Sequence, residues 1–189
     1  MDRDQFWALV EATRGGGCEQ HAGRLAARLR TLPPTEIVAF QRIYDELIDE
    51  SYRWDLWGAA YLADGGCSDD GFDYFRGWLL GQGRATWEAA LRDLDSPAVY
   101  SQLHDPDWRP GWDRLECEDL VGVAFYAYEA VTGRDIYQAV RAQESPDATE
   151  ERSVRQPAGE DWDFDDLDEM RRRYPRLWSR VRQLYEEDP

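Results

Sequence analysis

"WDLWGAAYLADGGCSDDGFDYFRGWLLGQG", residues 54–83, contains two helical patterns separated by a pair of glycines. Gly65-Gly66 ends the first pattern, because glycine leaves helical geometry at little cost. Ser68 is a suitable N-cap for a second helix over about 69–82, and Gly83 suits the position just after its end. Both segments repeat large apolar residues at helical spacing, which predicts two core helices packed against each other or against a third.

The same helical periodicity recurs along the chain, and no alternation typical of a β-strand reaches a useful length. Helices are predicted over about 2–13, 19–31, from Pro34 or Thr35 onward, 86–92, 96–103 and 115–132, with a final helical pair around Pro175. The segment RWDLWGAAYLA either continues the third helix with a kink or forms a separate one. The fold class is therefore all-α: a compact, irregular multi-helix domain of about six to eight helices with a C-terminal helical appendage.

Composition divides the chain into three parts. Residues 1–142 are predicted to form the helical domain, and residues 143–162, which are polar and contain Pro, Gly and Ser, a linker. Residues 163–189 are predicted to form a helical pair that packs on the domain. Its apolar contact residues are Leu177, Trp178, Val181 and Leu184.

Charge and residue usage limit the possible compartments and partners. All 22 basic residues are arginine, and the chain contains no Lys and no Asn, which indicates a bacterial source with a high-GC genome. The formal net charge of −17 argues against direct nucleic-acid binding, because phosphate contacts need a positive surface. The N-terminus shows no apolar signal core, and no apolar run is long enough to span a membrane. We expect a soluble cytoplasmic protein with no membrane partner.

The three cysteines, Cys18, Cys67 and Cys117, are isolated and odd in number. This pattern predicts reduced thiols rather than a disulfide framework or a zinc site. Cys67 is the candidate nucleophile, but His21 and His104 lie far from it in sequence, so no Cys–His pairing can be argued. The triglycine at 15–17 is not followed by Lys-Ser or Lys-Thr, so a phosphate-binding loop of that type is absent, and we expect no cofactor.

Arg76 interrupts an apolar helix face, beside Phe72 and Leu79. A charge on such a face needs a partner, because burying an isolated ion is very costly. The predicted partner is Glu116 or Asp69, in a partly buried ion pair of a type that a guanidinium can form with two parallel hydrogen bonds. Two interpretations follow: a structural salt bridge inside the core, or an anchor in a ligand cleft.

Asp69, Asp70 and Asp73 open the helix that carries Arg76. Carboxylates at spacings of three and four residues can hold a divalent cation. Acidic residues are also favoured in a first helical turn, near the positive end of the helix dipole. The three aspartates spread over about 100° of the helix surface, so the capping role is preferred and no metal is predicted.

These residues also carry a family resemblance. Trp54, Asp55, Leu56, Trp57, Ala59, Ala60 and Tyr61 match the first part of the motif of the bacterial DUF4240 family, a domain of unknown function. Gly65, Gly66, Ser68, Asp69, Asp70, Phe72, Phe75, Arg76, Trp78, Leu79 and Gly83 match its second part. The resemblance covers roughly residues 1–140 and implies a small intracellular helical domain, with no activity to carry over.

Three hypotheses for function remain. The first is a non-catalytic interaction or regulatory module that binds a protein or small molecule, which could be basic, in a cleft. The second is an enzyme, metal- or carboxylate-dependent, that uses Asp69, Asp70, Arg76 and Glu116. The third is an acidic decoy or immunity-type inhibitor of a basic protein. The cleft of the first hypothesis is predicted to be lined by Trp54, Asp55, Trp57, Asp69, Asp70, Arg76 and Glu116.

Overall fold

The computed structural model describes residues 1–96, 100, 103, 115–143 and 156–182, and these form eleven helices without a strand. The first six are α1 (Arg3–Thr13), α2 (Cys18–Leu29), α3 (Pro34–Glu50), α4 (Trp54–Asp64), α5 (Asp69–Gly81) and α6 (Arg84–Arg92). The others are α7 (Glu118–Val121), α8 (Val123–Thr132), α9 (Ile136–Arg141), α11 (Leu167–Arg173) and α12 (Pro175–Val181). The all-α class is confirmed, with somewhat more helices than expected. The helix predicted at 96–103 lies mostly outside the described residues.

Local signals set the helix ends. Asp2 and Gln5 form a reciprocal capping box at the start of α1, which satisfies two otherwise unpaired amides. Ser68 Oγ accepts the amide N–H of Gly71 at 3.1 Å and caps α5, as predicted. Gly65 follows the end of α4 with φ +71°, a left-handed conformation that favours glycine.

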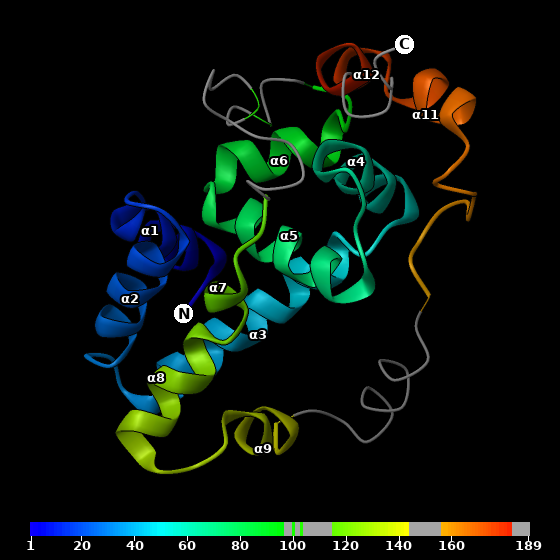
Figure 1. The fold of residues 1–189 in the computed structure, drawn as a ribbon. Helices are drawn as coiled ribbons and strands as arrows, with labels where there is room; N and C mark the ends of the chain where they lie inside the picture. The colour runs from blue at the N-terminus through cyan, green and yellow to red at the C-terminus, as the bar shows by residue number, and fades with distance from the viewer. Residues whose placement is uncertain (97–99, 101–102, 104–114, 144–155, 183–189) are drawn as a thin grey trace.

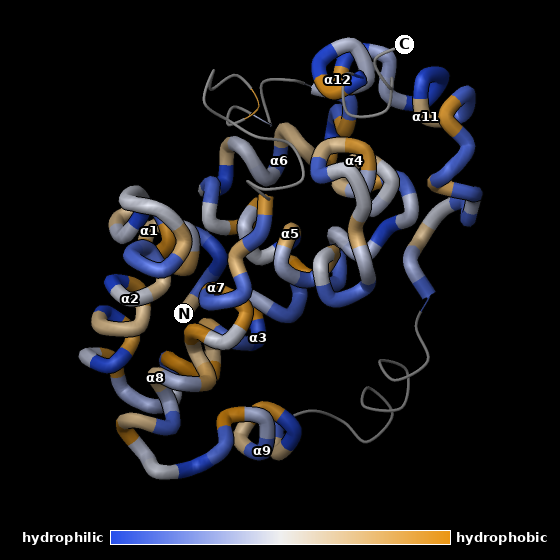
Figure 2. Tube along the Cα trace, viewed as in Figure 1, coloured by the Kyte–Doolittle hydropathy of each residue, from blue (hydrophilic) through white to orange (hydrophobic). Residues whose placement is uncertain are grey.

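Helix α5 occupies the middle of the fold (Figure 1), where it contacts α2, α4, α6 and α7. Its side chains are mostly buried, including Phe72, Phe75 and Leu79. Helix α8 packs between α2 and α3, and its tube in Figure 2 is mostly orange and white, as expected for a helix with apolar neighbours. None of the described helices combines the length and apolar character needed to cross a lipid bilayer.

The structure decides between the alternatives at one predicted helix boundary and corrects another. Segment 54–64 is a separate helix, because residues 51–53 interrupt the helix between α3 and α4. The long helix predicted over about 115–132 is wrong in its extent: it begins at Glu118 and divides at Gly122 into α7 and α8. Glycine weakens a helix interior, and a Cβ at this position would lie 2.8 Å from the ring of Tyr126. The apolar face continues across the break, which is why periodicity alone did not reveal it.

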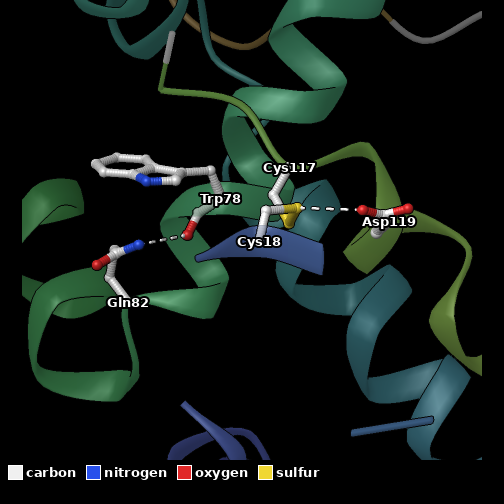
Figure 3. Close-up of a disulfide and its surroundings, with 5 residues drawn as sticks. All are labelled: Cys18, Trp78, Gln82, Cys117 and Asp119. Carbon is white, nitrogen blue, oxygen red and sulfur yellow. Dashed lines mark hydrogen bonds between the residues drawn. A yellow bond between two sulfur atoms is a disulfide. The ribbon is translucent and has the colours of Figure 1, made fainter. Parts of the chain in front are cut away.

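Cys18 and Cys117 form a disulfide bond, so the expectation of reduced thiols is wrong. The two residues are 99 positions apart in sequence, and their Cα atoms lie 5.4 Å apart. Figure 3 shows the bond between the start of α2 and the chain just before α7. Sequence spacing could not reveal this pair, because only the tertiary packing of α2 on α7 brings the two residues together. Cys67 is buried and is not part of a disulfide.

The described C-terminal segment lies against α4. Ala158 forms a parallel bridge with Arg53, in which Trp54 N donates to Ala158 O at 3.0 Å. The ring of Phe164 contacts Trp54 and Trp57, and the hydroxyl of Tyr61 donates to Asp165 Oδ1 at 2.6 Å, so the acidic segment at 159–170 packs inward through its aromatic residues. Helix α12 also contacts α4, and its buried residues are Leu177, Trp178 and Val181. Leu184 and most of the predicted linker lie outside the described residues, and the division into 1–142, 143–162 and 163–189 stays a prediction.

Gly58 is a point of close approach between this segment and α4. A Cβ there would lie 2.6 Å from Trp162 Cζ2 and 2.8 Å from the hydroxyl oxygen of Tyr174. We therefore expect Gly58→Ala to lower the free energy of unfolding by about 1–3 kcal/mol through overpacking. We also expect faster hydrogen exchange of the α11 and α12 amides, measured by mass spectrometry.

Gly23 provides the matched control, because a Cβ at this helical position meets no atom within 4 Å. Gly23→Ala should be neutral or stabilising by up to about 1 kcal/mol, since alanine is the better helix former. Equal stability of the two variants would show that the C-terminal segment does not pack on Gly58.

Candidate functional site

Four of the seven predicted cleft residues line one open pocket of about 370 Å³, here called the aspartate pocket. Its walls come from the end of α3, the connection to α4, α4 itself and the first two turns of α5. They are formed by Ile48, Asp49, Tyr52, Trp57, Asp69, Asp70, Phe72, Asp73 and Arg76. The members predicted from sequence are Trp57, Asp69, Asp70 and Arg76.

A stack of aromatic rings forms one side of this pocket. Trp57 is stacked between Trp54 and Phe72, with ring centroids 5.4 Å and 5.0 Å away and nearly parallel planes. Its indole Nε1 donates to the carbonyl of Cys67 at 3.0 Å, which fixes the ring orientation. With both faces covered and its donor used, Trp57 is a rigid wall whose exposed part is a ring edge.

Arg76 forms the floor of the aspartate pocket, with only 4% of its surface exposed. The predicted pairing with Glu116 or Asp69 is wrong: the carboxylate that Arg76 reaches is Asp73, three residues earlier on the same helix. Asp73 and Arg76 both lie on α5, so this ion pair forms within one helix and needs no tertiary contact. Exposure of the Asp73 side chain is 54%, and the pair is thus only half shielded from water.

The other contacts of Arg76 are to backbone and rings. Nη1 donates to the carbonyl of Ile48 at 3.0 Å, in the last turn of α3, where carbonyl groups lack helical partners. The positive guanidinium thereby caps the negative end of the α3 dipole. Its central carbon also lies 4.7 Å from the ring centroid of Phe72 and 4.9 Å from that of Tyr52, which are cation–π distances. Arg76 therefore joins α3, α5 and their connection.

Carboxylates surround the mouth of the pocket. Asp69 and Asp70 lie in the first turn of α5, Asp73 follows one turn later, and Asp49 comes from α3. Asp69, Asp70 and Asp73 are exposed. Among the residues that the structure describes, no three His, Cys, Asp or Glu side chains are grouped so that they could hold a metal ion.

Trp54, Asp55 and Glu116 do not line the aspartate pocket. Asp55 forms a salt bridge with Arg53, and its Oδ1 accepts from the amide of Leu56 at 2.8 Å. Two residues along a helix correspond to about 200° of rotation, so Asp55 and Trp57 face opposite sides of α4. Trp54 lies behind the ring of Trp57.

Glu116 lies near the start of α5 on a different side. A Cβ built on Gly71 would come within 3.3 Å of Glu116 Oε1. The carboxylate therefore sits beside Gly71, away from the guanidinium that it was predicted to meet. The prediction placed Glu116 on the apolar face of a helix that begins near residue 115. In the structure Glu116 precedes α7, so it is not part of that helical face and does not meet Arg76.

Sequence reasoning missed Asp49 and Tyr52 as pocket residues. The available signal was the short connection between the third and fourth helices, which keeps the end of one near the start of the next. Cys67, the candidate nucleophile, is buried at 8% exposure, and its sulfur lies 3.6 Å from the carbonyl of Ser68. It does not line the aspartate pocket.

Comparisons with known proteins agree with the motif at 54–83. The model of the family described as "Protein of unknown function (DUF4240)" matches residues 1–130 of the chain. No curated protein matches the sequence. No solved structure matches the fold either. Because the family model covers more than two thirds of the 189 residues, the chain belongs to the DUF4240 family.

Proposed function

We propose that the chain is a non-catalytic binding module whose aspartate pocket receives a cationic group of a protein partner. The cation is a guanidinium or ammonium side chain on a basic surface. The observation that supports this most directly is the charge distribution of the pocket: four aspartates line it, and the one arginine among its walls is committed to Asp73, to a backbone carbonyl and to two rings.

The chemistry of the walls fits such a side chain. Carboxylates at Asp69 and Asp70 can accept charge-assisted hydrogen bonds, which are stronger than neutral ones. The methylene part of an arginine or lysine can pack along the edge of Trp57 and the ring of Tyr52. The net charge of −17 adds a long-range attraction that speeds association with a basic protein at low salt.

The enzyme hypothesis receives less support from the same geometry. It requires Asp69, Asp70, Arg76 and Glu116 to act on one substrate, yet Glu116 is not among the residues that line the pocket. The inhibitor hypothesis shares the basic partner with our proposal. It differs in stating that binding inhibits the partner. An assay of the partner's activity would test this once the partner is identified.

The peptide Ac-Gly-Arg-Gly-NH2 tests the proposal by calorimetric or NMR titration. We expect it to bind, and the double variant Asp69→Asn, Asp70→Asn to bind at least tenfold more weakly. Each lost charge-assisted hydrogen bond is worth about 1.5–3 kcal/mol, and tenfold in affinity corresponds to about 1.4 kcal/mol. Binding should also weaken as salt is added, because the carboxylates are exposed.

Two controls separate a specific pocket from general acidity. The peptide with citrulline in place of arginine keeps the shape and loses the charge, so it should not bind measurably. The double variant Glu129→Gln, Asp161→Asn removes the same charge from exposed positions outside the pocket and should bind like the parent. Equal weakening by both double variants, or equal binding of both peptides, would refute the pocket as the site.

A further inference from the structure

A second cleft, of about 430 Å³, lies at the start of α2 and shares no lining residue with the aspartate pocket. We call it the triglycine cleft, because Gly15 and Gly17 of the triglycine at 15–17 form part of its rim. Its volume falls within the usual range for small-molecule sites. The disulfide between Cys18 and Cys117 forms part of the wall and holds the start of α2 in place.

The charge of this cleft is opposite to that of the chain. Arg14 is the one formally charged side chain at neutral pH among the described residues that line it. Its Nη1 donates to the carbonyl of Gln82 at 2.6 Å, which holds the guanidinium across the cleft, between the end of α1 and the end of α5. A positive charge on the wall of a cleft, in a protein of net charge −17, favours an anionic ligand at that place.

The backbone at the rim offers donors to the same anion. Gly17 is the N-cap of α2, a twelve-residue helix, and no side chain caps this helix. The amides of Gly17 and Cys18 have no acceptor within the described part of the chain. Free amides at a helix N-terminus, together with the helix dipole, form a site for phosphate or carboxylate groups.

An independent observation comes from Trp78 on the opposite wall. This residue is only 5% exposed, and its indole Nε1 has no hydrogen-bond partner among the residues that the structure describes. Figure 3 shows the indole nitrogen on the ring edge that faces Gln82, another residue of the cleft. Leaving a buried donor unpaired is unfavourable, so an acceptor brought by a ligand would be stabilised at this position.

Neither of two further polar groups, His21 and Asp119, brings a negative charge into the cleft. His21 Nε2 lies 3.0 Å from the carbonyl of Val10, which only accepts, so Nε2 carries the proton and Nδ1 is an acceptor. Burial lowers the pKa of His21 more than this hydrogen bond raises it, and the imidazole is neutral at pH 7. Asp119 Oδ2, at 3.7 Å from Cys18 Sγ, lies on the far side of the sulfur atoms from Trp78 in Figure 3, and Asp119 does not line the cleft.

We propose that the triglycine cleft binds a small organic molecule through its oxyanion group, phosphate or carboxylate. The amides of Gly17 and Cys18 and the guanidinium of Arg14 bind the oxyanion. The indole N–H of Trp78 donates to a further oxygen of the same molecule. This site does not depend on the aspartate pocket, and either proposal can fail without the other.

The test is an NMR titration of the ¹⁵N-labelled protein with three probes: glycerol 3-phosphate, glycerate and glycerol. We expect the two anions to shift the amide signals of Gly17 and Cys18 and the indole signal of Trp78, and glycerol to shift none of them. The anion that binds more tightly shows whether the cleft prefers a phosphate or a carboxylate group. If neither anion shifts these signals, or if glycerol binds as tightly as the anions, the proposal is overturned.

Variants link the binding to the named groups. Arg14→Gln removes the charge and should weaken anion binding at least tenfold, whereas Arg42→Gln, the same change at an exposed site away from the cleft, should leave it unchanged. Trp78→Phe keeps an aromatic side chain without the N–H group, assigns the indole signal by its loss, and should weaken binding severalfold or more. Equal weakening by Arg14→Gln and Arg42→Gln would show that the net charge of the protein, and not the cleft, determines anion binding. This result would overturn the proposed site. Circular dichroism confirms that each variant is folded.

Discussion

Reducing the Cys18–Cys117 disulfide should lower the free energy of unfolding by about 4–5 kcal/mol, the value that chain entropy predicts when a loop of about 100 residues is opened. For a chain of this size the melting temperature should fall by about 10–15 °C. Since folded domains are stable by only about 5–15 kcal/mol, this is a large share of the total. Urea unfolding with and without a phosphine reductant measures the change.

The double variant Cys18→Ser, Cys117→Ser should reproduce the stability of the reduced protein without any reagent. Cys67→Ala keeps the disulfide, so the difference between its oxidised and reduced forms should persist. Thiol labelling of the unfolded, unreduced protein should modify one cysteine per chain, Cys67. Labelling of all three would contradict the disulfide directly.

The second large effect is expected from Arg76→Met, which replaces the aliphatic part of the side chain with an unbranched apolar one and removes the charged guanidinium. The carbonyl of Ile48 loses its charged donor, worth about 1.5–3 kcal/mol. The contacts with the rings of Phe72 and Tyr52 lose their cation–π component, about 1–2 kcal/mol. We expect a total loss of about 3 kcal/mol, measured by thermal and urea unfolding.

Asp73→Asn is the matched comparison, because it removes only the ion pair. Its side chain is 54% exposed, and exposed pairs contribute about 1 kcal/mol or less, so the loss should be small. A large effect of Arg76→Met beside a small effect of Asp73→Asn would assign Arg76 a structural role through α3. An unchanged melting temperature for Arg76→Met would contradict that role and would favour the hypothesis that Arg76 anchors a ligand.

The parts of the fold that could be predicted are those encoded locally. Helices α1 to α6 begin and end near the predicted residues, because caps, glycines and apolar periodicity act over a few positions. The division at Gly122 escaped prediction because the apolar face continues on both sides of it. The disulfide escaped because it depends on the packing of segments 99 residues apart.

The candidate site follows the same rule. Trp57 and Phe72 could be assigned to facing surfaces of two helices, and they do stack. The partner of Arg76 was sought across the fold, at Glu116, but was found one turn away, at Asp73. Helical periodicity predicts which side of a helix a residue occupies, but not how far neighbouring helices are rotated or shifted, and that shift places Glu116 beside Gly71.

The disulfide also changes how the protein carries mechanical load. It closes a covalent ring that runs from Cys18 to Cys117 and encloses the entire motif at 54–83. A force applied at the two chain ends passes through the sulfur–sulfur bond and bypasses every residue between them. Roughly 330–360 Å of extended chain is thereby withheld from stretching. The aspartate pocket, apart from its contacts with the C-terminal segment, stays free of tension even when the rest of the chain is pulled straight.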